Sequence, residues 1–157
     1  MTADGIDDAL RAFKRKVFGD STGSVPRVFL NVLRRSVPPT AHAVGNSYPD
    51  RGYHVVMWLY GSVFGLMSCE GSNDDSDTQI EGIILPLSEL TLVRIGVEQQ
   101  DYDPELRRVT QWTRRATFNF GGKELHYSAL ETTEGSDKTG EFIDRVLLTM
   151  STLGQTR

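Results

Sequence analysis

The spacing of apolar residues changes twice along the chain, and these changes limit the folds that it can adopt. Up to about residue 37, apolar residues recur every three or four positions, as they do in amphipathic helices. From about residue 53 to residue 130 they recur at every second position, as in strands with one buried face. From about residue 138 the helical spacing returns. The sequence therefore predicts an α+β fold in which two N-terminal helices and one C-terminal helix accompany an antiparallel sheet.

The two N-terminal helices are predicted from their apolar stripes and their end residues. The stripe of the first helix, over residues 5–18, consists of Ile6, Leu10, Phe13 and Val17. Gly19 ends this helix, because glycine is common just past a helix end. Ser24 is expected to cap the second helix, since Pro26 then lies in its first turn, where proline is tolerated. The pair Pro38-Pro39 ends it.

Six strands are predicted where the period of two holds. They span residues 53–60, 62–69, 79–85, 91–98 and 111–120, with a sixth that runs through Leu125, Tyr127 and Ala129. The strand at 111–120 shows the clearest alternation, and Gly121-Gly122 turns the chain after it. Residues 70–78 and 99–108 are predicted to be loops. A further strand within residues 36–51 would bring the count to seven.

A C-terminal helix is predicted to pack on this sheet. Ser136 or Asp137 caps it, and Gly154 ends it. Its wide apolar face consists of Phe142, Ile143, Val146, Leu147, Met150 and Leu153. Because an antiparallel sheet cannot bury its inner face alone, this helix is expected to cover it. The prediction is one domain over residues 1–157, with a helical segment at 1–37 and the sheet and its helix at 52–153.

Composition and charge exclude several classes of protein. A length of 157 residues, with 38% hydrophobic and 24% charged residues, is typical of one folded soluble domain. The single cysteine forbids an internal disulfide, and together with an acidic rather than basic N-terminus it indicates a cytoplasmic protein. Residues 1–51 hold eight basic and five acidic residues, whereas the remainder holds nine basic and sixteen acidic ones. This imbalance is too small for a nucleic-acid-binding protein.

The order of strands and helix resembles that of pleckstrin-homology-like barrels, including the bacterial and GRAM-type members. The resemblance covers residues 52–153 and rests on an early strand at 54–59 (HVVMWL), a connection at 85–90 (LPLSEL) and the helix from Lys138. It implies a strongly bent sheet, usually of seven strands, with the helix plugging one open end. Pleckstrin-type phosphoinositide recognition uses basic residues of an early hairpin. That hairpin, 59–62 (LYGS), has none, so the resemblance implies the fold without headgroup binding.

Motifs for catalysis or for metal binding are absent from the sequence. The three histidines are scattered and show no metal-ligand spacing, and His54 is expected at the sheet surface. Cys69 ends an apolar strand and is expected to be buried. The acidic run at 73–77 lacks the glycine and the distal glutamate of an EF-hand loop, so an exposed loop is predicted instead. No cofactor, metal site or catalytic residue is therefore predicted.

Three clusters of basic residues are the candidate binding residues. The first lies on the N-terminal helix, where Arg11, Lys14 and Arg15 are spaced to form one strip beside the apolar stripe. The others are the adjacent pairs Arg34 and Arg35, and Arg114 and Arg115. The alternation of their strand places Arg115 on the polar face and Arg114 among the apolar positions. Each cluster could be an ordinary solvated surface, or it could bind an anionic partner.

Three functions remain open at this point. The leading prediction is a non-catalytic binding module for another protein, which binds at a sheet edge or groove that the N-terminal helices either cover or extend with their basic strip. The second is peripheral binding of a membrane or an anionic ligand by the same strip together with Lys16. The third is a small enzyme that uses His54 or His126 with a carboxylate such as Glu124 or Asp101.

Overall fold

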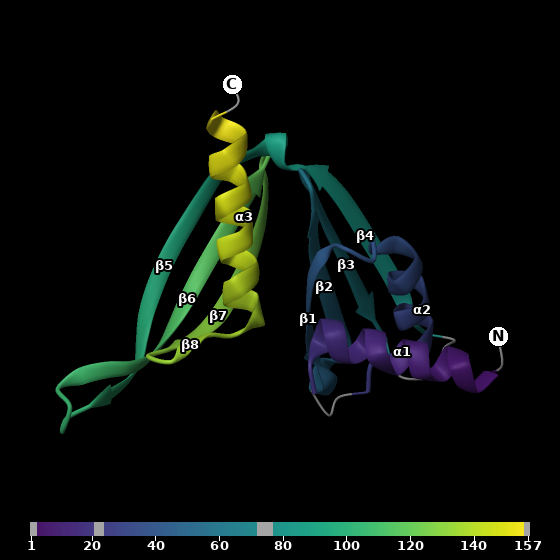
Figure 1. Cartoon of the computed structure of the whole chain (residues 1–157), viewed down its shortest axis with the longest axis horizontal. Helices are drawn as coiled ribbons and strands as arrows, with labels where there is room; N and C mark the ends of the chain where they lie inside the picture. The colour runs from purple at the N-terminus through teal and green to yellow at the C-terminus, as the bar shows by residue number, and fades with distance from the viewer. Residues whose placement is uncertain (1–2, 21–23, 72–76, 156–157) are drawn as a thin grey trace. The chain divides into compact units, whose positions relative to one another are not determined.

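The structure is a computed structural model of the whole chain, and it describes residues 3–20, 24–71 and 77–155. The chain divides into two compact units, Met1–Ile84 and Leu85–Arg157, which we describe in turn as unit 1 and unit 2 (Figure 1). The acidic run at 73–77 falls almost entirely outside the described residues.

Unit 1 consists of two helices followed by a four-stranded antiparallel sheet. The helices are α1 (Ala3–Phe18) and α2 (Arg27–Ser36). The strands are β1 (His42–Tyr48), β2 (Tyr53–Tyr60), β3 (Val63–Glu70) and β4 (Gln79–Pro86), in the order β1-β2-β3-β4, and a 3-10 turn, η1 (Pro49–Arg51), joins the first two. A two-residue turn at Gly61 and Ser62 connects β2 to β3 as predicted.

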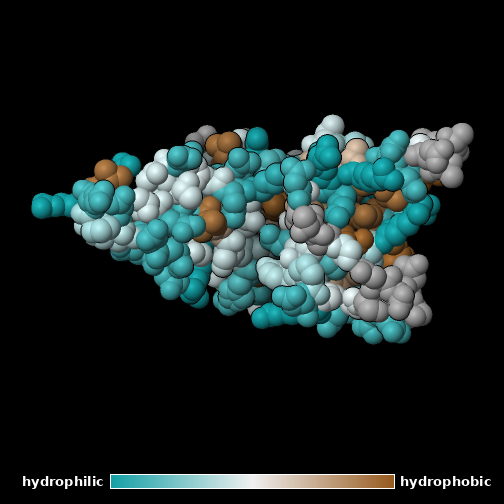
Figure 2. Space-filling view, turned by 90° about the horizontal axis from the view of Figure 1, so that it is seen from below, coloured by the Kyte–Doolittle hydropathy of each residue, from teal (hydrophilic) through white to brown (hydrophobic). Residues whose placement is uncertain are grey.

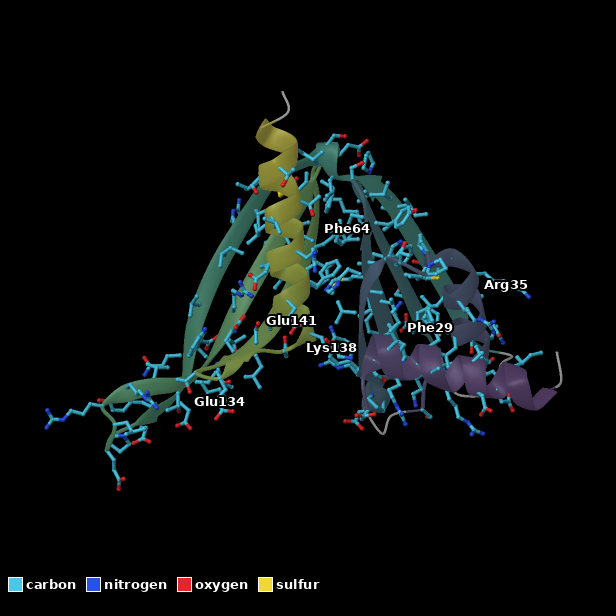
Figure 3. The ribbon with its side chains drawn as sticks, in the orientation of Figure 1. Phe29, Arg35, Phe64, Glu134, Lys138 and Glu141 are labelled. Atoms are coloured by element: carbon cyan, nitrogen blue, oxygen red, sulfur yellow. The ribbon has the colours of Figure 1, made fainter. Side chains whose placement is uncertain are left out.

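The core of unit 1 lies between the two helices and one face of this sheet. Phe29 and Leu33 of α2 are fully buried, and Phe29 points toward the sheet (Figure 3). From the sheet, Val56 and Trp58 of β2 enter the same cluster. Gly65, which pairs with Trp58, leaves room for the indole, because a Cβ there would lie 2.0 Å from the ring. The apolar stripe of the first helix thus faces the sheet.

Unit 2 consists of a second four-stranded antiparallel sheet and the C-terminal helix. A 3-10 turn, η2 (Leu87–Glu89), leads into it. The strands are β5 (Leu90–Asp103), β6 (Arg108–Phe120), β7 (Lys123–Thr132) and the very short β8 (Gly135–Ser136), in the order β5-β6-β7-β8. The helix α3 (Lys138–Gln155) packs over β7 and β8, and it buries Phe142, Ile143 and Val146. The predicted C-terminal packing helix is confirmed.

The single sheet of six or seven strands is not confirmed. The strands form two four-stranded sheets, and they are not closed into a barrel. One reason is Pro86, which ends β4 and has no N–H to donate to a ladder; the chain then makes the η2 turn before β5 begins. The barrel that the pleckstrin-homology-like resemblance implied is therefore not formed by the described strands.

Several predicted boundaries are corrected. The segment left open at 36–51 contains β1, and the predicted loop at 99–108 is mostly strand, because β5 continues to Asp103 and β6 begins at Arg108. Pro26 rather than Ser24 is the N-cap of α2. At α3, the predicted cap by Asp137 is confirmed, since its carboxylate accepts a hydrogen bond from Gly140 N at 2.9 Å.

Candidate functional site

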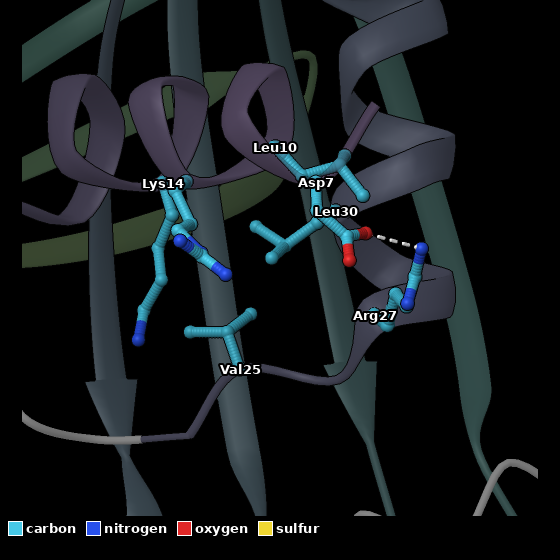
Figure 4. A pocket seen from close by; sticks show the side chains of 7 residues that line it. Asp7, Leu10, Lys14, Val25, Arg27 and Leu30 are labelled. Carbon is cyan, nitrogen blue, oxygen red and sulfur yellow. Dashed lines mark hydrogen bonds and ion pairs between the residues drawn. The ribbon is translucent and has the colours of Figure 1, made fainter. Parts of the chain in front are cut away.

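The two N-terminal helices enclose a small pocket with an apolar floor and a charged rim. Its floor consists of Leu10, Val25 and Leu30, and its volume is about 160 Å³ (Figure 4). Its rim carries Asp7, Arg11, Lys14 and Arg27. Arg27 Nη2 lies 2.5 Å from Asp7 Oδ1, an ion pair that joins the start of α2 to the first turns of α1. Three cations and one carboxylate leave this rim positively charged.

A wider groove adjoins this pocket, and Arg27 belongs to both. The groove has a volume of about 510 Å³ and is lined by Ile6, Arg27, Val28, Asn31, Val32 and Arg35. Ile6, Val28 and Val32 are partly exposed and form an apolar strip. Arg35 points away from the sheet at the end of this strip (Figure 3). We call this lining the cationic groove.

The cationic groove combines apolar and basic surface in one place. No carboxylate lines it among the described residues, and its two arginines stand at opposite ends of the apolar strip. In the space-filling view, apolar atoms (brown) are visible between hydrophilic atoms (teal) in the half that carries α1 (Figure 2). Such a surface suits an anionic ligand that also has an apolar side.

The basic strip predicted on the first helix is largely paired with nearby groups. Arg11 lies 3.6 Å from Asp8, and Arg15 lies 3.4 Å from Asp20, both as exposed ion pairs. Lys16 Nζ donates a hydrogen bond to the carbonyl oxygen of Pro39 at 2.9 Å. Arg11 and Lys14 reach the rim of the pocket, whereas Arg15 and Lys16 line neither the pocket nor the groove.

The pair at the end of α2 is exposed. Arg34 and Arg35 occupy the last turn of the helix, where cations interact favourably with the helix dipole. In the portion of the chain that the structure describes, neither side chain contacts a carboxylate. These two arginines are therefore available to a partner without loss of an internal ion pair.

Arg114 is an internal residue of unit 2. Its side chain is 17% exposed and contacts three groups: Glu131 Oε1 lies 2.8 Å from Nε, Asp144 Oδ1 lies 2.6 Å from Nη1, and the carbonyl oxygen of Gly140 lies 3.0 Å from Nη2. The hydrogen bond to Asp144 is the main cause that raises the pKa of Arg114, so the guanidinium stays charged. Arg114 thus ties β6 to β7 and to α3, which makes it a structural residue whatever it contributes to binding.

Arg115 lies on the opposite face of the second sheet, as the alternation predicted. Its side chain is 64% exposed and forms an ion pair with Glu98 of β5. The same face holds Arg94, which lies 3.8 Å from Glu124 of β7. Charges of opposite sign therefore alternate across this open face.

The prediction that His54 lies at the sheet surface is wrong. It lies on β2, is only 2% exposed, and its Nδ1 is 2.7 Å from Ser47 Oγ of the neighbouring strand β1. Burial, and to a smaller extent the charge of Lys14, lowers the pKa of His54. It faces the helices because it alternates in phase with Val56 and Trp58, both of which belong to the core. Burial of Cys69 is confirmed, and burial raises the pKa of its thiol.

Of the histidines and carboxylates considered for an enzyme, the structure brings His126 and Glu124 close together. His126 Nε2 lies 3.8 Å from Glu124 Oε2, and its Nδ1 lies 3.0 Å from Thr117 Oγ1, on the open face of unit 2. Asp101 pairs instead with Gln111 in the β5–β6 ladder. Across residues 3–20, 24–71 and 77–155, no group of three potential metal ligands is found.

Sequence reasoning missed two parts of this site. The sequence analysis does not single out Arg27, and it assigns Ile6 wholly to the apolar stripe of the first helix. The signal for both was present, because Arg27, Asn31 and Arg35 recur at intervals of four, next to the apolar positions Val28 and Val32. That spacing places them on one side of α2, but only the packing of the two helices brings Ile6 to the same groove.

Comparisons with known proteins give no family for this chain. No family model matches it, and no curated protein matches it. Among solved structures, it is similar to crystal structures of MRP1/MRP2 from Trypanosoma bruciei, with 10% identity, a TM-score of 0.33, and coverage of 87% of this chain and 100% of that one. A likeness at this TM-score carries no argument about fold or function. No helix in the described parts of the chain is long and apolar enough to cross a membrane.

Proposed function

We propose that this protein is a non-catalytic binding module whose cationic groove takes an acidic amphipathic helix of another protein. The observation that carries the proposal is the apolar strip between Arg27 and Arg35, which no acidic side chain lines among the described residues. A helix that lies in a groove presents apolar side chains at intervals of three and four residues. Those side chains would pack on the strip, while carboxylates beside them would face Arg35 first, because Arg27 already forms an ion pair with Asp7.

The charge pattern around the groove favours an acidic partner. Arg34 stands beside Arg35, and Lys14 and Arg11 extend positive charge along the adjoining pocket. Charge complementarity of this kind increases the association rate and disfavours basic partners. The prediction is therefore an interaction that weakens as the salt concentration rises.

The packing of α1 argues against the membrane alternative. A helix that lies on a membrane inserts its apolar face between lipids. In this structure that face is turned inward, since Leu10 is 5% exposed and Val17 is 1% exposed. Lipid insertion of α1 would thus require the helix to leave its sheet.

A peptide-binding experiment tests the proposal. The probe is a fluorescein-labelled peptide that has leucines at helical spacing and glutamates between them, and fluorescence anisotropy reports its binding to the full chain. Replacing both arginines at the end of α2 (R34E/R35E) is expected to weaken binding about tenfold or more. The variant R107E/R108E carries the same change of charge at an exposed site in unit 2, and it should bind like the unmodified protein.

The outcome that contradicts the proposal is equally specific. It is wrong if both variants bind the peptide equally well, or if a peptide with lysines in place of the glutamates binds as tightly. Binding to phosphatidylserine vesicles but not to the acidic peptide would instead support the membrane alternative. In a second step, capture from cell lysate by the unmodified protein and by R34E/R35E would identify the natural partner.

A further inference from the structure

Strand β5 is a long edge strand with one free side. It pairs with β6 on one side only, because the sheet order is β5-β6-β7-β8 (Figure 1). The ladder with β6 is regular from Leu92 to Gln99, and irregularities occur only outside that stretch. No lysine or proline interrupts it, although edge strands are commonly protected by such residues. The free side therefore presents an uninterrupted run of backbone N–H and C=O groups.

The helix of unit 2 leaves the apolar face of β5 uncovered. Ile95 pairs with the buried Ala116 and so lies on the face that α3 covers, yet it is 45% exposed. Val97, which pairs with Arg114 on the same face, is 67% exposed. Since α3 packs over β7 and β8 at the other side of the sheet, this helix does not cover these two side chains.

The sequence of β5 is complementary to itself about its central glycine. Residues 93–99 read Val-Arg-Ile-Gly-Val-Glu-Gln. When two identical edge strands pair antiparallel, the two-fold axis passes between one residue and its own copy. With Gly96 at the axis, Arg94 lies opposite Glu98 of the second copy on one face, and Ile95 lies opposite Val97 on the other. Both kinds of cross-strand pair stabilise a sheet.

Neighbouring registers lack this match. An axis at Ile95 places Arg94 opposite a glycine and Glu98 opposite Leu92. An axis at Val97 places Arg94 opposite a glutamine and Glu98 opposite a glycine. The charge pairs therefore select the register about Gly96.

Gly96 itself has no role in its own unit that requires glycine. A Cβ at this position would meet nothing within 4 Å, and its backbone is not in the left-handed region. Glycine within a strand weakens the strand, and it often marks a place where another backbone approaches. In a symmetric pair about this residue, Gly96 would lie opposite its own copy with no side chain between the two.

The ion pairs already present are compatible with a second copy. Arg94 is 66% exposed beside Glu124, and Glu98 is 53% exposed beside Arg115. Pairing about Gly96 would bring these four side chains into one row of alternating charge, in the order Glu124, Arg94, Glu98 of the second copy and Arg115 of the second copy. Each charge then has neighbours of opposite sign.

We infer that the protein forms a two-fold homodimer in which the β5 edges of two copies pair antiparallel about Gly96 and join two sheets into one. Each apolar pair of Ile95 with Val97 occurs twice, on the face that α3 leaves open. This interface is separate from the cationic groove, so R34E/R35E should leave dimerisation unchanged.

Charge reversal and its rescue test the interface. Sedimentation of the full chain at micromolar concentration should give twice the 17.5 kDa mass of one chain. Either E98R or R94E places like charges opposite each other twice, and each is expected to raise the dissociation constant about tenfold or more. The double variant R94E/E98R should restore the dimer. This rescue is diagnostic, because the double variant reverses the charge beside Glu124 and beside Arg115 and so repairs neither ion pair within one chain.

Cross-linking tests the register. The variant G96C should form a disulfide between copies under mild oxidation, because the two cysteines would lie directly opposite each other. In the variant V93C the two introduced cysteines would be about 20 Å apart along the strand, so no such cross-link is expected. Three results would each overturn the inference: a monomer at micromolar concentration, a dimer that E98R does not weaken, or a double variant R94E/E98R that stays monomeric.

Discussion

The two four-stranded sheets are covered to different extents, and the difference decides which surfaces of each unit are exposed. In unit 1 two helices lie on one sheet, and the central strand β2 is buried along most of its length. In unit 2 a single helix lies over β7 and β8, and β5 is exposed at most of its positions. The second helix of unit 1 thus adds an outer helical surface to that unit, whereas unit 2 has a single helix and a long, exposed edge strand.

Two arginine pairs that look alike in sequence also differ between the units. Arg34 and Arg35 stand on the outer surface of unit 1, whereas Arg114 is held inside unit 2. The largest expected effect follows from this difference. Arg114→Ala leaves the buried Glu131 without its counter-ion, and we expect a loss of about 3 kcal/mol in the free energy of unfolding. Urea denaturation followed by fluorescence of the two tryptophans measures it.

Arg115 provides the matched control for Arg114. Its pair with Glu98 is exposed, so Arg115→Ala should change stability by about 0.5 kcal/mol or less. R34E/R35E should lower stability by about 1 kcal/mol, because it places carboxylates instead of cations in the last turn of α2. Equal losses for Arg114→Ala and Arg115→Ala would show that the internal ion pairs of Arg114 stabilise unit 2 no more than the exposed pair of Arg115 does.

Substitution of one strand glycine in each sheet tests how tightly the two sheets are packed. Gly65→Ala would place a methyl group 2.0 Å from the indole of Trp58, which is buried in unit 1. Overpacking of this kind costs about 1–3 kcal/mol, measurable as a lower thermal unfolding temperature. Gly96→Ala meets open space on β5, and its effect should stay within about 0.5 kcal/mol. A tolerated Gly65→Ala would mean that the core of unit 1 is loosely packed.

The smallest expected effect is a pH dependence that belongs to unit 1. The folded pKa of His54 is lowered from 6.5, mainly by burial, so the folded chain binds its proton at lower pH than the unfolded chain does. Stability from this residue is complete above about pH 6.5 and is lost as the pH falls below that value, by at most about 1.4 kcal/mol per pH unit. Denaturation at pH 7.5 and 5.5 should therefore show a smaller pH effect in His54→Gln than in the unmodified protein. An unchanged difference contradicts this assignment.

Elements with a strong local signal were predicted well. The bounds of β2 were predicted correctly, because an apolar run ends at a turn with glycine. The hairpin of β6 and β7 and the helix α3 follow equally clear periodicity. Strand β1 has no such signal, since it is largely polar. It is held by its ladder to β2 and by Phe18, which packs where Gly45 has no side chain. Such contacts are distant in the sequence.

The candidate site shows the same division. The alternation of residues 111–120 correctly placed Arg114 among apolar positions, but its partners Glu131 and Asp144 lie 17 and 30 residues further along the chain. The separation of the strands into two sheets is also non-local, because periodicity describes faces and not pairings. The cationic groove needed the packing of α1 against α2 before Ile6 could be placed in it.

The carboxylate of Asp137 makes the two ends of α3 unequal in their dynamics. Besides capping the helix, it accepts a hydrogen bond from Leu130 N at 2.9 Å, and Asp137 N donates one to the carbonyl oxygen of Leu130 at 3.0 Å. The first turn is thus fastened to β7, whereas the last turn has no basic residue and Leu148 is 61% exposed. Fraying should therefore begin at the C-terminal end, and amide hydrogen exchange should slow steadily toward Phe142. We therefore expect α3 to unfold from its C-terminal end while its first turn stays bonded to β7.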